Sequence, residues 1–194
     1  MKSKQKVLIA AGALLLLLVA AALIYRALTL AYAPEETLPA AETEEAAPAE
    51  AAERPYAPDF TMLDAEGNEV RLVDFLGETP VVLNFWASWC PPCKAELPAF
   101  DAAYFDRGEE INFLMVDLAD GVQETEESAM AYLTENGFAF PAYFVTTGEA
   151  VSAYQLYSIP MTVAIDREGR IVSTRIGALS EESLAALLDA LEEA

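Results

Sequence analysis

Two cysteines, Cys90 and Cys93, are the residues of this chain whose type and spacing most clearly indicate chemistry. They are the only cysteines among 194 residues, and they belong to the pentapeptide Trp89–Cys93. The apolar run Val81–Trp86 before them is typical of a buried strand, and the residues after them are typical of a helix. Two thiols three residues apart at a helix start can close into a reversible disulfide, and the helix dipole there favours a thiolate. The spacing therefore predicts a redox-active site.

Pro91 and Pro92 separate the two cysteines. Proline is tolerated in a first helical turn because its missing N–H would be unpaired there anyway, so the pair can set local geometry without breaking the helix. Fewer N–H donors near the sulfurs also oppose the effect of the dipole on Cys90. The sequence therefore leaves open whether the pKa of Cys90 is raised or lowered.

Two structural interpretations of the cysteine pair are weak. A disulfide between residues three apart closes a very small loop and restrains the unfolded chain little. A structural zinc site needs about four ligands, and with no histidine and no further cysteine only carboxylates remain. The lack of histidine also excludes serine–histidine triads, histidine metal sites and imidazole acid–base chemistry. We expect no metal and no cofactor other than the redox disulfide Cys90–Cys93.

The chain is strongly acidic, with a formal net charge of -21 from 32 acidic and 11 basic residues. Such a surface repels the phosphates of nucleic acids and anionic lipid head groups, so nucleic acid is not an expected partner. Two interpretations of the charge remain open. It suits basic protein partners, or it simply keeps the protein soluble.

The N-terminal residues are expected to act as a membrane address. Residues 1–6 form a basic tail with three lysines, and residues 7–29 are predicted to be a transmembrane signal anchor. The uncharged part, Val7–Tyr25, would span about 28 Å as a helix, close to the thickness of a bilayer core. Three lysines before this run and only Arg26 directly after it predict a cytoplasmic N-terminus. The rest of the chain is then extracytoplasmic, on a single-pass protein of the cell membrane.

A linker, residues 30–55, is predicted between this anchor and the domain at 56–194. It is rich in Ala, Glu and Pro, cannot build a core, and should stay extended as a tether. A cleaved signal peptide is the alternative to an anchor, because Ala31–Ala33 resembles a small-x-small cleavage site, although Pro34 follows it. Either alternative exports the domain.

Strand-like and helix-like segments alternate through residues 56–194, which predicts an α/β fold with a mixed central sheet flanked by helices. Turn residues at 65–68 and 166–169 predict an N-terminal β-hairpin and a second hairpin near the end. The expected strands are 59–63, 69–72, 80–87, 111–118, 140–146, 161–165 and 170–176. The expected helices are 91–107, one capped by Thr125 that reaches Asn136, 149–157, and a last one capped by Ser180 with Leu184, Leu187, Leu188 and Leu191 on one face. In the strand 111–118, Asn112 and Asp117 are the only strongly polar residues.

Two motifs make this chain resemble a known family. The first is Asn84–Pro98, which reads NFWASWCPPCKAELP, and the second is Ser158–Asp166, which reads SIPMTVAID. With these motifs, residues 57–194 resemble a thioredoxin-like fold, and within it the membrane-anchored ResA/TlpA-type thiol-disulfide oxidoreductases. The N-terminal hairpin and a central insertion of about 30 residues after Leu118 also fit that family.

The resemblance implies a role for each residue of the motifs. Cys90 matches the exposed cysteine that forms a mixed disulfide with substrate, and Cys93 matches the resolving cysteine. Pro160 matches a cis-proline facing the cysteine pair, and its bond places the backbone of Ile159 where an extended substrate can pair with it. The substrate surface is expected to include Trp89, Pro91 and Pro92 as well, whereas Trp86 is expected in the core.

Glu96 is a third catalytic candidate. Thioredoxins carry a buried aspartate in the central strand, but Asn84 stands there in this chain and cannot titrate. ResA-type proteins carry a glutamate at the position of Glu96, near the thiols. A partly buried carboxylate there can shuttle the proton of the resolving thiol and raise the thiol pKa values. The alternative is a solvated helix glutamate.

The sequence thus predicts a membrane-tethered thiol-disulfide oxidoreductase that exchanges disulfides with exported proteins through Cys90 and Cys93. The resemblance favours a reductase, for example of apocytochrome c before haem attachment, supplied with electrons by a membrane donor of the CcdA/DsbD type. An oxidising disulfide donor would carry the same motif, and a redox-quiet binding module or chaperone is a further alternative. A peroxiredoxin-like peroxidase would want a threonine three residues before its cysteine, where this chain has Ala87.

Overall fold

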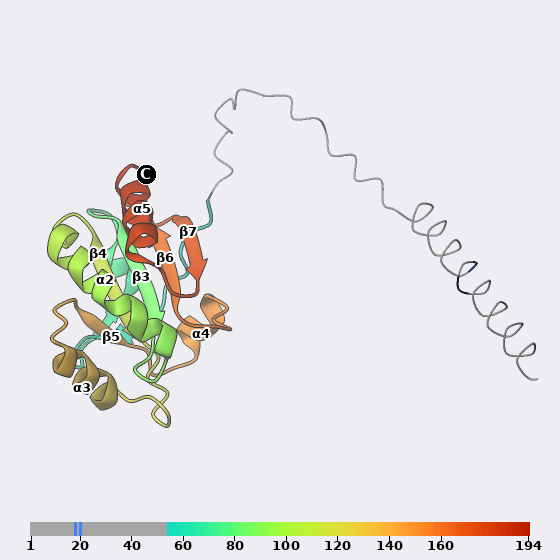
Figure 1. Ribbon diagram of the computed structural model, residues 1–194. Helices are drawn as coiled ribbons and strands as arrows, with labels where there is room; N and C mark the ends of the chain where they lie inside the picture. The colour runs from blue at the N-terminus through green and yellow to red at the C-terminus, as the bar shows by residue number, and fades with distance from the viewer. Residues whose placement is uncertain (1–17, 19, 21–53) are drawn as a thin grey trace, which may run out of the picture. The chain divides into compact units, whose positions relative to one another are not determined.

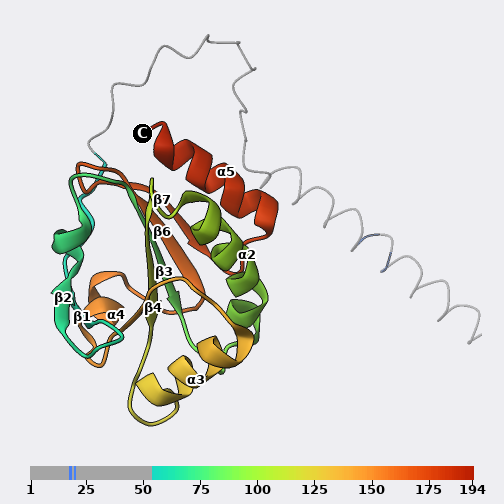
Figure 2. The same cartoon turned by 90° about the vertical axis from the view of Figure 1, so that its left-hand side faces the viewer.

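A mixed sheet of seven strands forms the centre of the computed structural model, which describes residues 54–194 together with Leu18 and Ala20. The strand order is β2-β1-β5-β4-β3-β6-β7, with β3, β4 and β5 parallel and the other neighbours antiparallel. Figure 1 labels β3 to β7, and Figure 2 labels β1 and β2. The strands are β1 (Thr61–Leu63), β2 (Glu69–Arg71), β3 (Val81–Trp86), β4 (Asn112–Asp117), β5 (Ala142–Phe144), β6 (Met161–Ile165) and β7 (Ile171–Ile176). The predicted α/β class and both predicted hairpins are confirmed.

Helices cover both faces of this sheet, as a mixed sheet with apolar residues on both sides requires. The helical elements are η1 (Leu72–Phe75), α2 (Pro91–Arg107), α3 (Glu126–Asn136), α4 (Glu149–Ala153) and α5 (Glu181–Glu192). In Figure 2, α2, α3 and α5 lie on one side of the sheet and α4 lies on the other. The order of the strands and α-helices agrees with the order predicted from the sequence, whereas the short 3-10 helix η1 was not predicted.

The central strand β3 is buried along its whole length and supplies both halves of the core. Because side chains alternate along a strand, Val82 and Trp86 pack with the residues of α2, α3 and α5. Leu83 and Phe85 point to the opposite face and pack against Phe60 and its neighbours. The strand that leads to the two cysteines is therefore held on both sides.

The helix starts follow the predicted caps. Thr125 Oγ1 accepts a hydrogen bond from the N–H of Ser128 at the start of α3, and Gly137 ends that helix in the left-handed region with φ 72°. At the start of α5, Ser180 Oγ accepts from the N–H of Ser183. The four leucines of α5 predicted to share one face are all buried.

Ser180→Ala should lower the free energy of unfolding by about 1 kcal/mol, because it removes the acceptor for an otherwise unpaired N–H at the start of α5. Urea unfolding measures the change. Thr134→Ala in the exposed part of α3 is the matched control, and we expect it to change stability by less than about 0.5 kcal/mol. Equal losses in the two variants would contradict the capping role.

Most predicted strands lose one or two residues in the structure, and two predicted elements, at 149–157 and 140–146, lose four. The helix predicted at 149–157 ends at Ala153. Tyr154 still donates its N–H to the Ala150 carbonyl, and Gln155 then takes a positive φ of 50°, which cannot continue a helix. The Tyr154 ring packs on Phe60 and Phe85, and its hydroxyl donates to the carbonyl of Pro58. The strand predicted at 140–146 is paired only over Ala142–Phe144. The N–H groups at positions 139 and 140 donate to the Asp101 carboxylate on α2 rather than to a strand.

Apart from Leu18 and Ala20, the predicted membrane anchor at 7–29 lies outside the described residues, and so does most of the linker at 30–55. No helix within the described part of the chain is both long enough and apolar enough to cross a membrane.

Candidate active site

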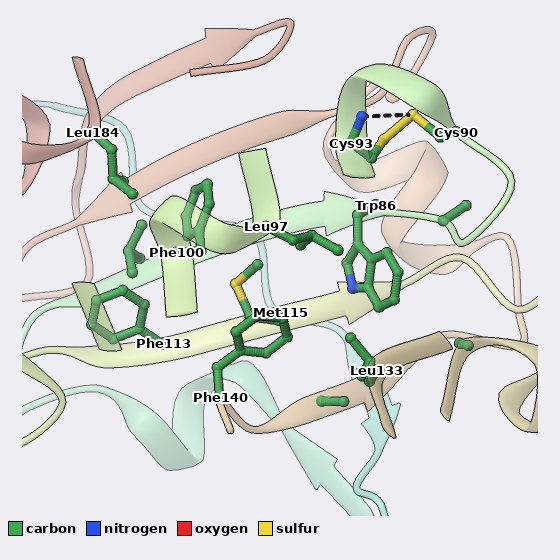
Figure 3. Close-up of a cluster of buried hydrophobic side chains, with 14 of the residues drawn as sticks. Trp86, Cys90, Cys93, Leu97, Phe100, Phe113, Met115, Leu133, Phe140 and Leu184 are labelled. Carbon is green, nitrogen blue, oxygen red and sulfur yellow. Dashed lines mark hydrogen bonds between the residues drawn. A yellow bond between two sulfur atoms is a disulfide. The ribbon is translucent and has the colours of Figure 1, made fainter. Parts of the chain in front are cut away.

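Cys90 and Cys93 lie at the N-terminus of α2, directly after the turn that follows β3. Their sulfurs form a disulfide, and Cys90 is the residue that caps the helix. The Cys90 Sγ accepts a hydrogen bond from the backbone N–H of Cys93 at 3.3 Å, drawn as the dashed line in Figure 3. The sulfur that starts the helix therefore takes one of the N–H groups that the first turn leaves unpaired. Pro91 and Pro92, between the cysteines, contribute no N–H.

The two sulfurs differ in access. With the disulfide closed, Cys90 is 3% exposed and Cys93 is 0% exposed, so Cys90 is less exposed than the resemblance implies. Cys90 nevertheless lines a groove of about 410 Å³, and Cys93 does not. The groove residues carry no ionisable group other than the Tyr157 phenol; they are Trp89, Cys90, Pro91, Pro92, Leu118, Leu156, Tyr157, Ser158 and Ile159. A substrate approaching through this groove meets Cys90 first.

The second motif faces the cysteines across the groove. The Ile159–Pro160 peptide bond is cis, which agrees with the expectation from the resemblance. The carbonyl oxygen of Ile159 lies 3.9 Å from the Cys90 sulfur. Pro160 is buried, whereas Ile159 is partly accessible beside the groove. The backbone of Ile159 is thus placed next to the sulfur that an incoming disulfide would attack.

The two tryptophans take different positions. Trp89 is 48% exposed and lines the groove. Trp86 is fully buried, and Figure 3 shows its ring between the disulfide and Leu133 of α3. Trp86 therefore packs in the core next to the disulfide, and Trp89 offers an exposed apolar surface beside Cys90.

Glu96 lies one turn beyond Cys93 on the buried face of α2 and is 1% exposed, so it is not a solvated helix residue. Its Oε1 accepts a hydrogen bond from Asn84 Nδ2 at 2.8 Å, and its Oε2 accepts from the N–H of Leu179 at 2.7 Å. The same Asn84 nitrogen also donates to Thr162 Oγ1 at 3.1 Å. A polar group thus connects α2 with β3, β6 and the loop before α5 in an otherwise apolar core.

Burial raises the pKa of Glu96 from its usual 4.5 to about 7, against the opposing effect of the hydrogen bonds from Leu179 and Asn84. A carboxyl group with a pKa near neutrality can both hold and release a proton under ordinary conditions. Because Glu96 lies on the same buried face of α2 as Cys93, it is placed to exchange a proton with that thiol.

Two further buried carboxyl groups lie below the active-site loop and were not identified as site residues from the sequence. Glu124 Oε2 accepts hydrogen bonds from both the N–H and the hydroxyl of Ser88, each at 3.0 Å, and Ser88 is two residues before Cys90. Asp117, at the end of β4, is fully buried. In the sequence, the only indication that Asp117 has a special role was its place as a polar residue within an apolar strand. No group of three potential metal ligands occurs in the part of the chain that the structure describes.

Comparisons with known proteins agree with this geometry. The AhpC/TSA family model matches residues 55–174. The thiol-disulfide oxidoreductase ResA of Geobacillus thermodenitrificans is 30% identical over 137 residues, which are 70% of this chain and 76% of that protein. The sporulation thiol-disulfide oxidoreductase A of Bacillus subtilis is 30% identical over 126 residues, 64% of this chain and 74% of that one. The crystal structure of StoA from Bacillus subtilis superposes with a TM-score of 0.59 and 28% identity, covering 68% of this chain and 97% of StoA.

Proposed function

Since the chain belongs to the AhpC/TSA family and is a thioredoxin-like thiol-disulfide oxidoreductase of the ResA/StoA type, we propose that it is a reductase of disulfides in exported proteins. One observation carries this proposal. The Cys90–Cys93 disulfide lies at the N-terminus of α2, where Cys90 lines an uncharged groove and the backbone of Ile159 lies beside its sulfur.

The reaction has two exchange steps in the reducing direction. The Cys90 thiolate attacks one sulfur of a substrate disulfide, which forms a mixed disulfide and releases the other substrate sulfur as a thiolate. Cys93 then loses its proton and attacks the Cys90 sulfur. This step closes the Cys90–Cys93 disulfide and releases the second substrate thiol. The two electrons that the substrate gains come from the dithiol of the protein, which a separate thiol donor must restore.

Glu96 is the group we assign to the proton of Cys93. The second step requires the loss of that proton inside the core, and Glu96 is the buried carboxyl group on the same face of α2, one turn away. With a pKa of about 7, it can accept the proton in one step and return it when the dithiol is regenerated.

The reducing direction rests on how poorly this site stabilises a thiolate. A strong oxidant is one whose reduced form is stabilised. Here Pro91 and Pro92 withhold two N–H donors from the sulfurs, and a buried Glu96 disfavours further negative charge nearby. Both effects favour the oxidised protein, so the dithiol should give up its electrons readily.

The equilibrium reduction potential of the Cys90–Cys93 pair tests the direction, together with turnover of a model protein disulfide. We expect a potential nearer to the about -270 mV of thioredoxin than to the about -120 mV of the oxidant DsbA. We expect turnover to be lost in Cys90→Ser. A potential near that of DsbA would overturn the reductase assignment. A wild type without turnover would instead support a redox-quiet binding module.

The place of action and the partners are part of the same proposal. The basic tail at 1–6 and the uncharged run that follows support a single membrane anchor with the domain on the extracytoplasmic side. A tethered reductase outside the cytoplasm needs electrons from within the membrane, so we propose a thiol carrier of the CcdA/DsbD type as donor. Exported proteins with disulfides, apocytochrome c among them, are the proposed substrates.

A further inference from the structure

Asp117 is a buried carboxyl group that the exchange reaction does not use. It is 0% exposed, and neither of its oxygens has a hydrogen-bond partner within the described part of the chain. Asp117 pairs in register with Trp86 on the neighbouring strand β3. The indole N–H of Trp86 is likewise buried and unpartnered among the described residues. Because Phe113 and Met115 of β4 face the α2 side of the sheet, strand alternation places Asp117 on that side too, with Trp86.

Glu124 is the second buried carboxyl group here, and its surroundings differ. It accepts hydrogen bonds from the N–H and hydroxyl of Ser88 and from the hydroxyl of Ser128, all at 3.0 Å. It also directly precedes Thr125, which caps α3, so it lies at the positive end of that helix dipole. Glu124 therefore has three donors around its oxygens, whereas the oxygens of Asp117 have no hydrogen-bond partner among the described residues, which suits a neutral acid.

The charges around Asp117 also favour its neutral form. Burial is the main reason that the pKa of Asp117 is raised from 3.8 to about 8, and the negative charges of Glu124 and Asp120 raise it further. On the neighbouring strand β5, the residue beside Asp117 is the apolar Phe144. On α2, the cation of Lys94 lies over the ring of Tyr132. The charged side chains in the first turn of α3, Glu126 and Glu127, are both acidic.

We propose that Asp117 is a positioning residue for Cys90: as a neutral acid it leaves the hydrogen bonds from Ser88 to Glu124 intact, and its ionisation weakens them. The reason is electrostatic. Two buried carboxylates repel each other strongly in a medium of low dielectric, and the charge of Glu124 acts on Asp117. When Asp117 releases its proton to solvent, the pair must move apart or draw in water. The link that moves is the Glu124–Ser88 contact, which holds the loop carrying Cys90. This inference adds to the proposed function and concerns the same thiol.

The fluorescence of Trp86 in the oxidised protein reports the titration directly. The chain has two tryptophans and no histidine, and the closed disulfide does not titrate. In a Trp89→Phe background, we expect the emission of Trp86 to change between about pH 7 and 9, where Asp117 ionises. Adding Asp117→Asn should remove this change, whereas adding Glu96→Gln should leave it. A change that persists in Asp117→Asn would overturn the assignment of Asp117.

Glu124→Gln and Asp120→Asn test the coupling without altering Asp117. Removing the buried negative charge at Glu124 should move the Trp86 transition to a lower pH, whereas Asp120→Asn, at an exposed position, should move it less. These variants keep the proposal testable if Asp117→Asn does not fold. An unchanged midpoint in Glu124→Gln would overturn the coupling between the two carboxyl groups.

The positioning role itself is measured on the reduced protein. The rate of alkylation of Cys90 in Asp117→Asn should equal the wild-type rate at pH 6 and exceed it on the order of threefold at pH 9, because only the wild type acquires the second charge. If the alkylation rate of Asp117→Asn relative to wild type is the same at pH 6 and pH 9, the positioning role is wrong. The fluorescence titration does not depend on turnover, so it separates failure of this inference from failure of the proposed function.

Discussion

Cys93→Ser should convert the protein from a catalyst into a trap that accumulates a mixed disulfide with its substrate through Cys90. The groove is lined by Cys90 and not by Cys93, so the first attack on an external disulfide needs only the Cys90 sulfur. The second attack needs the buried thiol one helical turn away, which serine cannot replace. We expect turnover of a model disulfide to fall below detection while a covalent adduct builds up. Gel electrophoresis without reducing agent measures that adduct.

Cys90→Ser is the matched control, because it removes the accessible sulfur and keeps the buried one. It should form no adduct. If Cys90→Ser traps substrate and Cys93→Ser does not, the assigned order of attack is wrong. In cells, partners trapped by Cys93→Ser should be exported proteins in the membrane or extracytoplasmic fraction. Trapped partners confined to cytoplasmic proteins would contradict the proposed location and leave the order of attack intact.

The parts of this site that could be predicted from the sequence depend on local patterns. The bounds Pro91–Arg107 of α2 follow from a buried strand, two prolines and the helix-forming residues after them. Thr125 and Ser180 cap helices because their hydroxyls reach an N–H three residues on. The cis bond before Pro160 agrees with the expectation from a motif, not from any physical pattern.

The other parts depend on contacts between residues distant in the chain. The partners of Glu96 are Asn84 of β3 and the backbone of Leu179, which is 83 residues away. The contact between Ser88 and Glu124 spans 36 residues and joins the active-site loop to the central insertion. No periodicity encodes such pairs, because they arise only when the sheet order and the packing of the helices are fixed. The packing of the Tyr154 ring on Phe60 is a contact of the same kind.

Glu96→Gln should remove a large pH dependence of stability. The pKa of Glu96 is about 7 in the folded protein against 4.5 as its usual value. Between about pH 4.5 and pH 7 the Glu96 carboxyl group is ionised in the unfolded chain but still protonated in the folded protein. The stability that neutral Glu96 contributes below about pH 4.5 is therefore lost as the pH rises to about 7. The shift corresponds to a loss on the order of 3 kcal/mol. Urea unfolding at pH 5 and pH 8 measures the slope.

Glutamine suits this test because it can keep the surrounding hydrogen bonds without the charge. Its oxygen can accept from Leu179. Its nitrogen then faces Asn84, whose amide must turn over so that the Oδ1, which has no partner among the described residues, accepts in place of the donating Nδ2. Glu135→Gln, on the exposed face of α3, changes the same formal charge and should keep the wild-type slope. Because Asp117 also titrates above its usual range, the difference between wild type and Glu96→Gln isolates Glu96. If the two slopes are equal, Glu96 is ionised throughout this range, and the proton that Cys93 loses must go to another group.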